Sequence, residues 1–284
     1  MSWQILLGIS ILTYVISQIL QRVLLKEEST DPLAFAIVFQ LFVGVVIGVY
    51  AMIKGFSFPA NVYSLLPHLF LTLVLYGVGN IFLFKSLKAI PISEFTILFS
   101  TSTLWTIVGA VIFLHEKFLL PHILGTLLIL TSLFFVFKPS SKMKISRGHI
   151  HSLIAAGLFG FAFVNDAFVL KTFEVNSYVS LGFILPAIGL LVVYPRSIKN
   201  IIVLLKPDNL KKLSITVLFY AVSAITIFTA YIEGHNSAVI SVVGKTSSIL
   251  IVLAGIVFLG ERDNTVRKII GACIATVGVI LLVL

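Results

Sequence analysis

The segment TLWTIVGAVIFLHEK at residues 103–117 recurs as SILIVLAGIVFLGER at residues 248–262, and this repetition decides the fold. The two segments are offset by 145 residues, about half of the 284-residue chain. Each ends a long apolar run on Phe-Leu-x-Glu, and a basic residue follows the glutamate. A repeat of about half a chain predicts two similar bundles of elements.

The composition excludes a water-soluble globular protein. Hydrophobic residues make up 59% of the chain and charged residues 11%, with a mean hydropathy of +1.13, whereas soluble domains carry about 25% charged residues. Continuous apolar stretches of about 18 or more residues recur along the whole chain, and each is long enough to cross a bilayer. We therefore predict an all-α integral membrane protein, whose helices satisfy their own backbone groups.

The net charge of +9 does not indicate affinity for nucleic acid. Most Lys and Arg residues fall between the apolar stretches, where they set orientation and contact anionic lipid head groups. We expect the lipid bilayer, and no nucleic acid, as a partner. The single cysteine, Cys273, permits neither an intramolecular disulfide nor a thiolate cluster, and we expect no cofactor and no metal.

Apolar length and helix breakers predict ten transmembrane spans. They lie at about residues 5–24, 33–53, 65–88, 92–114, 119–137, 150–173, 177–195, 213–233, 237–259 and 267–284. The polar stretch KPSSKMKISRG at residues 138–148 divides them into two sets of five. We predict five-helix repeats at residues 1–138 and 149–284, joined by a linker at 139–148. Five is odd, so the second repeat enters the membrane from the opposite side and the repeat is inverted.

Small residues spaced four apart mark where helices approach closely. They occur at Gly44 and Gly48, at Ala156 and Gly160, and at Gly271 and Ala275. One interpretation is packing within the chain. The other gives the fifth and tenth spans a contact in a homodimer, and the pattern does not separate the two.

The segment SLKAIPISEFTILFSTSTLWTIVGAVIFLHEK at residues 86–117, followed by PHILGTLLIL, resembles the EamA-type domain of the drug/metabolite transporter superfamily. The second copy, with FLGER at 258–262 and IIGACIATVGVILL at 269–282, fits better, because His115 replaces the usual glycine in the first. The resemblance covers the whole chain. It implies a secondary carrier of a small molecule, in many members an exporter, in the cell membrane, most often the prokaryotic plasma membrane. It implies no enzymatic activity.

Glu116 and Glu261 carry the signature of the resembled family. In the functional interpretation they bind a proton or the substrate. In the structural one they lie at helix ends, within reach of Lys117 or Arg262 and of free N–H groups at the next helix start. We favour the structural role, because both residues fall at the membrane edge rather than the midplane.

Lys245 and Asp166 are the ionisable residues predicted to lie deepest in the membrane. Lys245 replaces Ser100 of the first repeat, so this charge breaks the symmetry. Both fall on the same side of the midplane at similar depth, because their spans run in opposite directions. They form either a buried salt bridge that sets the packing or a substrate or proton site facing a cavity. Two opposite charges at similar depth suit an amino acid-like substrate.

Further polar and aromatic side chains are candidates for a midplane cavity. Glu233 and Asp166 are the candidates for proton coupling. Glu94 and Lys88 flank the turn at Pro91, where they are able to pair. The candidate substrate-binding residues besides Lys245 and Asp166 are Asn165, Asn80, Tyr76, Trp105, Tyr231 and Ser100.

The distribution of basic residues predicts the orientation. Of the 20 Lys and Arg residues, 16 fall in loops away from the N-terminal side, three fall on the N-terminal side, and Lys245 is inside a span. The positive-inside rule places both termini outside the cytoplasm, whereas the resemblance implies termini inside. The alternative function, a membrane enzyme or flippase acting on a lipid-linked substrate, lacks an HExxH pattern or clustered His and Asp residues.

Lys245→Met is expected to abolish or redirect uptake into proteoliposomes, because it removes the deep charge that the first repeat lacks. Folding, checked by size-exclusion chromatography and circular dichroism, should stay largely intact. Unchanged transport kinetics would show that Lys245 does not face the cavity.

Overall fold

The protein is a bundle of helices. The structure, a computed structural model, describes residues 2–113, 120–137, 145–234, 244 and 246–283. The first half of the chain forms α1 (Trp3–Lys26), α2 (Pro32–Lys54), α3 (Val62–Ala89), α4 (Ile92–Phe99), α5 (Ser102–Phe113) and α6 (Leu120–Phe137). The second half forms α7 (Arg147–Val169), α8 (Val175–Val193), η1 (Pro195–Ser197), α9 (Ile198–Leu204), α10 (Pro207–Gly234), α12 (Ser247–Phe258) and α13 (Thr265–Val283). These described residues include no β-strand.

Seven helical segments of the described chain are long and apolar enough to cross a membrane. Two shorter apolar helices lie at Ile123–Ser132 and Ser247–Phe258. The prediction of a helical, multi-pass membrane protein is confirmed at this level. The seven segments are α1, α2, α3, the run Ile92–Phe113 that joins α4 and α5, α7, α8 and Pro207–Ala230 of α10.

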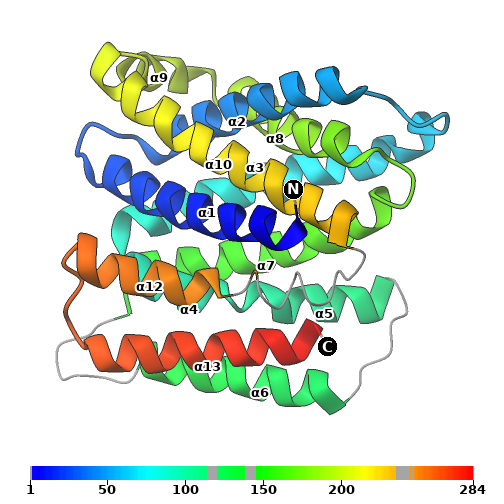
Figure 1. Cartoon of the computed structure of the whole chain (residues 1–284). Coiled ribbons are helices and arrows are strands. Elements are labelled where there is room, and N and C mark those ends of the chain that lie inside the picture. Colours follow the sequence, from blue (N-terminus) through cyan, green and yellow to red (C-terminus); the bar gives the residue numbers. More distant parts are fainter. Residues whose placement is uncertain (1, 114–119, 138–144, 235–243, 245, 284) are drawn as a thin grey trace.

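Helices from the two halves of the chain pack against each other. The most extensive packing is between α1 and α10, α6 and α13, α3 and α7, and α2 and α8, and α7 also packs on α5, and α4 on α12. Figure 1 shows both termini at one end of the bundle and the connections after α1, α3 and α12 at the other. The halves therefore form one interleaved bundle rather than two separate domains.

The span predicted at residues 92–114 corresponds to the apolar segment Ile92–Phe113, which consists of two helices rather than one. α4 ends at Phe99 and α5 begins at Ser102. Between them, the Ser100 hydroxyl donates to the Ile97 carbonyl at 2.6 Å, and the Thr101 hydroxyl donates to the Leu98 carbonyl at 2.7 Å. Hydroxyls that bond to backbone carbonyls compete with the helical ladder and bend it.

The small-residue pairs lie at close contacts between helices of this chain. A Cβ built on Gly44 would lie 2.6 Å from a side-chain carbon of Ile184, and one on Gly48 would lie 2.7 Å from the Ser180 hydroxyl. Gly160 of α7 faces α5, where a Cβ would lie 2.4 Å from the Trp105 Cβ. Packing within the chain thus accounts for these small residues.

Gly160→Ala is expected to destabilise the protein by about 2 kcal/mol, because the added methyl overlaps Trp105 and the Ser102 carbonyl oxygen, 2.6 Å away. A lower apparent Tm in detergent is the measurement. Gly157→Ala is the matched control on the same helix, since its nearest neighbour would lie 3.6 Å away. Equal Tm values for the two variants would contradict the assigned packing.

Candidate functional site

A cavity lies between the two halves of the bundle. It consists of two adjoining volumes of about 440 Å³ and about 770 Å³. Both volumes are lined by residues of α1, α4, α7 and α10, and they share Asp166. Sites of about 300–1,000 Å³ are typical for small-molecule ligands. The helices of the two halves therefore enclose a space of the size of a small metabolite.

Asp166 is a partly exposed carboxylate on this cavity wall. Tyr76 of α3 donates a hydrogen bond to Oδ2 of Asp166, and Tyr178 of α8 donates to Oδ1 at 2.6 Å. The Tyr178 hydroxyl also lies 2.9 Å from the Thr72 hydroxyl. Among the described residues that line the two volumes, Asp166 is the single charged side chain. The arrangement orients a carboxylate toward the cavity.

Asn80 supplies a second polar group in the smaller volume. Its Nδ2 donates to Oε1 of Gln40 at 3.0 Å and to the carbonyl oxygen of Tyr76 at 2.8 Å. Gln18 and Gln21 of α1 line the same volume. These amides are able to donate to or accept from a polar ligand without adding charge.

Asn165, although adjacent to Asp166, turns away from the cavity. It is buried against α3, where its Oδ1 lies 2.7 Å from Nδ1 of His68 and its Nδ2 donates to the Thr72 hydroxyl at 2.9 Å. Trp105 packs over Gly157 and Gly160 of α7. Neither Asn165 nor Trp105 is among the lining residues.

The remaining predicted residues are distributed as follows. Ser100 lines the larger volume, and Glu233 is exposed near the end of α10, away from the lining residues. Lys245 and Glu116 lie outside the described residues, as does the Tyr231 side chain. The predicted pairing of Lys245 with Asp166 is therefore still a prediction.

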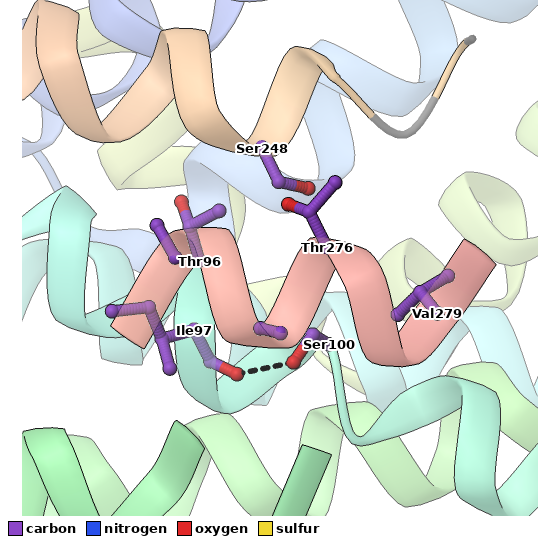
Figure 2. A pocket seen from close by; sticks show the side chains of 8 residues that line it. Thr96, Ile97, Ser100, Ser248, Thr276 and Val279 are labelled. Carbon is purple, nitrogen blue, oxygen red and sulfur yellow. Dashed lines mark hydrogen bonds between the residues drawn. The ribbon is translucent and has the colours of Figure 1, made fainter. Parts of the chain in front are cut away.

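A small pocket of about 10 Å³ adjoins the larger volume, where α4 meets α12 and α13. Figure 2 shows the hydroxyls of Ser100, which follows α4, of Ser248 in α12 and of Thr276 in α13 around it. The Thr276 hydroxyl is buried and has no hydrogen-bond partner among the described residues. A pocket of this size and polarity accommodates about one water molecule.

Glu261, of the repeated Phe-Leu-x-Glu signature, is buried and caps a helix of the other half. Its carboxylate accepts from the backbone N–H groups of Ile92 at 2.7 Å and Ser93 at 3.0 Å, and from the Ser93 hydroxyl at 2.6 Å. These N–H groups belong to the first turn of α4, which has no earlier intrahelical acceptors. Glu261 thus caps a helix of the opposite repeat rather than the next helix along the chain.

Charged groups from both halves surround this cap. Glu94 Oε2 lies 3.1 Å from Nε2 of His149, and its Oε1 lies 3.8 Å from Nζ of Lys268. Lys88 does not pair with Glu94. Instead its ammonium donates to the carbonyl oxygen of Thr30 at 2.6 Å and closes the α1–α2 connection. The expected Lys88–Glu94 pair is therefore wrong, because α7 and α13 supply closer partners for Glu94.

Several aromatic residues of the cavity were missed by the sequence analysis. Tyr14, Tyr178 and Tyr220 line the smaller volume, beside many phenylalanines. Aromatic residues are frequent throughout the chain, at 12%. In an apolar helix of nearly uniform hydropathy, periodicity does not distinguish a ring that faces a cavity from one that faces lipid.

The sequence matches the EamA-like transporter family over residues 1–138 and again over 146–284. No curated protein matches the chain. A solved structure, described only as "Crystal structure of protein", is similar to it over 96% of each chain, with a TM-score of 0.55 and 12% sequence identity. At that identity the likeness shows a shared fold alone.

Glu261→Ala is expected to lower stability by about 2 kcal/mol, because it leaves the first N–H groups of α4 and the Ser93 hydroxyl without their acceptor. The apparent Tm in detergent measures the loss. Asp263→Ala, an exposed acid two residues away, is the control and should change stability by less than about 0.5 kcal/mol. A Glu261→Ala variant as stable as the control would rule out the cap.

Proposed function

Because the chain belongs to the EamA-like transporter family, we propose that it is a secondary transporter that moves a small metabolite through the central cavity by alternating access. The observation that carries the proposal is the cavity of about 440 Å³ and 770 Å³ between the two halves, with one carboxylate on its described wall. The family consists of transporters, which also argues against an enzyme.

The proposed architecture is ten spans in two inverted five-helix repeats, at residues 1–138 and 149–284 with a linker at 139–148. The run α4–α5 counts as one span, and α6, the region of α12, and α13 complete the ten. The helix pairs support two symmetry-related repeats: the first span of one half packs on the third of the other, the second on the second, and the fifth on the fifth. Exchanging the halves leaves this pattern unchanged, as expected for two repeats related by a pseudo-two-fold axis.

The polar cluster at Glu261 supports a closed end. At the end of the bundle opposite the termini, α4, α7 and α13 are joined by four side chains, those of Glu94, His149, Lys268 and Glu261. Alternating access requires this end to open when the cavity faces that side, so contacts between the halves must separate there.

Within the cavity we assign substrate or proton binding to Asp166, and supporting contacts to Tyr76, Asn80 and Ser100. For an amino acid-like substrate, Asp166 would bind the ammonium group, and Lys245 is the proposed partner of the carboxylate. Export across a prokaryotic plasma membrane is the proposed direction and location. The bilayer and the small molecule are the proposed partners, with a homodimer through the fifth and tenth spans as a further proposal.

Asp166→Asn is expected to reduce transport at least tenfold, because it removes the charge on the described cavity wall. The measurement is counterflow in proteoliposomes with a labelled panel of amino acids, amines, nucleosides and sugar phosphates. Asp208→Asn is the control, an exposed acid at the start of α10. Wild-type rates in Asp166→Asn would remove Asp166 from the mechanism, and no counterflow of any compound by the wild type would contradict a transporter of these classes.

A further inference from the structure

The chemistry of the cavity wall points to a substrate class. We propose that the cavity binds a small monovalent amine carried on an aromatic ring, with its ammonium group at Asp166 and its ring between aromatic side chains. The inference rests on the proposed transport function, because it names what this same cavity takes. It differs from an amino acid-like substrate in requiring no cationic partner.

Charge is the first argument. Of the described residues that line either volume, Asp166 alone is charged. The other polar groups are amides and hydroxyls, such as those of Gln18, Gln40 and Ser223. A single carboxylate in a poorly solvated cavity attracts a cation and repels an anion. The carboxylate on the described wall therefore favours a positive charge on the ligand.

The geometry at Asp166 leaves room for an ammonium group. Tyr76 donates to one carboxylate oxygen and Tyr178 to the other, so each oxygen has one hydrogen bond from the protein. A carboxylate accepts about four hydrogen bonds in all, whereas an ammonium group has three donors. The tyrosines hold the carboxylate in place, and its remaining acceptor sites are available to the ligand.

Aromatic rings dominate the rest of the wall. Twelve of the 24 residues that line the smaller volume are aromatic, against 12% of the chain as a whole. This enrichment is the second argument. If the wall only had to be apolar, the aliphatic residues that prevail elsewhere in the chain would be sufficient. Aromatic faces attract a cation and pack on a ligand ring.

These rings form two groups. In one, the Tyr220 ring centroid lies 5.2 Å from that of Phe39 and 5.6 Å from that of Phe183. In the other, the Phe159 ring centroid lies 5.2 Å from that of Tyr76, which binds Asp166. The two groups line the same volume, so a planar ring has aromatic neighbours from both halves of the chain while its amine reaches the carboxylate.

The test is binding of matched probes to the purified full-length protein in nanodiscs, measured by isothermal titration calorimetry. The probes are 2-phenylethylamine, 2-phenylethanol (no charge), 2-cyclohexylethylamine (no aromatic ring) and phenylalanine (an added carboxylate). We expect 2-phenylethylamine to bind tightest, with at least tenfold weaker binding of 2-phenylethanol and of phenylalanine. The cyclohexyl compound should bind several-fold more weakly.

Two variants test the contributions of the carboxylate and of the aromatic rings separately. Asp166→Asn should weaken the binding of 2-phenylethylamine at least tenfold and leave the binding of 2-phenylethanol unchanged. Phe159→Leu should weaken the binding of both aromatic probes. Asp208→Asn is the matched control. If Asp166→Asn does not fold, Tyr178→Phe is used in its place. It should weaken the binding of the amines by a smaller factor and leave the binding of 2-phenylethanol unchanged. Equal affinity for 2-phenylethanol or phenylalanine, or no detectable binding of 2-phenylethylamine, would overturn the inference.

The same probes in proteoliposomes distinguish this inference from the proposed function. Binding of 2-phenylethylamine with no uptake or counterflow of any probe supports the inference and counts against transport. Counterflow of an anionic or neutral metabolite, without binding of the amines, supports transport and overturns the inference.

Discussion

In a bilayer every backbone N–H group must find its partner within the protein, and at the start of α4 that partner is the carboxylate of Glu261. The donor and acceptor come from opposite halves of the chain, 169 residues apart. This one contact places the connection between α12 and α13 against the start of α4. The position of α4 in turn decides where Phe95, Phe99 and Ser100 enter the cavity wall.

The need to satisfy backbone groups within the protein also explains the break between α4 and α5. A run of hydroxyl residues interrupts the fourth span, and Ser100 and Thr101 bond to carbonyls of the preceding turn. The break lies beside the cavity and the small pocket of Figure 2. A chain that must satisfy its backbone groups internally thus uses side-chain hydroxyls where it departs from a regular helix, and it does so next to its proposed binding site.

The sequence indicated the kind of interaction better than its partners. It assigned Glu261 to free N–H groups at a helix start, but placed them at the next helix along the chain rather than in the opposite repeat. It marked the pair Asn165 and Asp166 as polar groups in a span, yet only Asp166 lines the cavity, while Asn165 bonds to His68 and Thr72. Adjacent residues on a helix point about 100° apart, so two neighbours at the same depth face different partners. Lys88 and Glu94, close in sequence, bond to different elements.

Composition, span length and the repeated segment were sufficient to determine a helical membrane protein of this transporter family, because hydrophobic length and internal repetition are properties of the chain alone. Which side chains share a cavity was decided by the tertiary structure. The lining residues come from several helices of both halves of the chain, and in uniformly apolar helices hydropathy does not indicate a direction. Only the packing of α3, α7 and α8 brings Tyr76 and Tyr178 onto the two oxygens of Asp166, because that contact depends on where three separate helices cross.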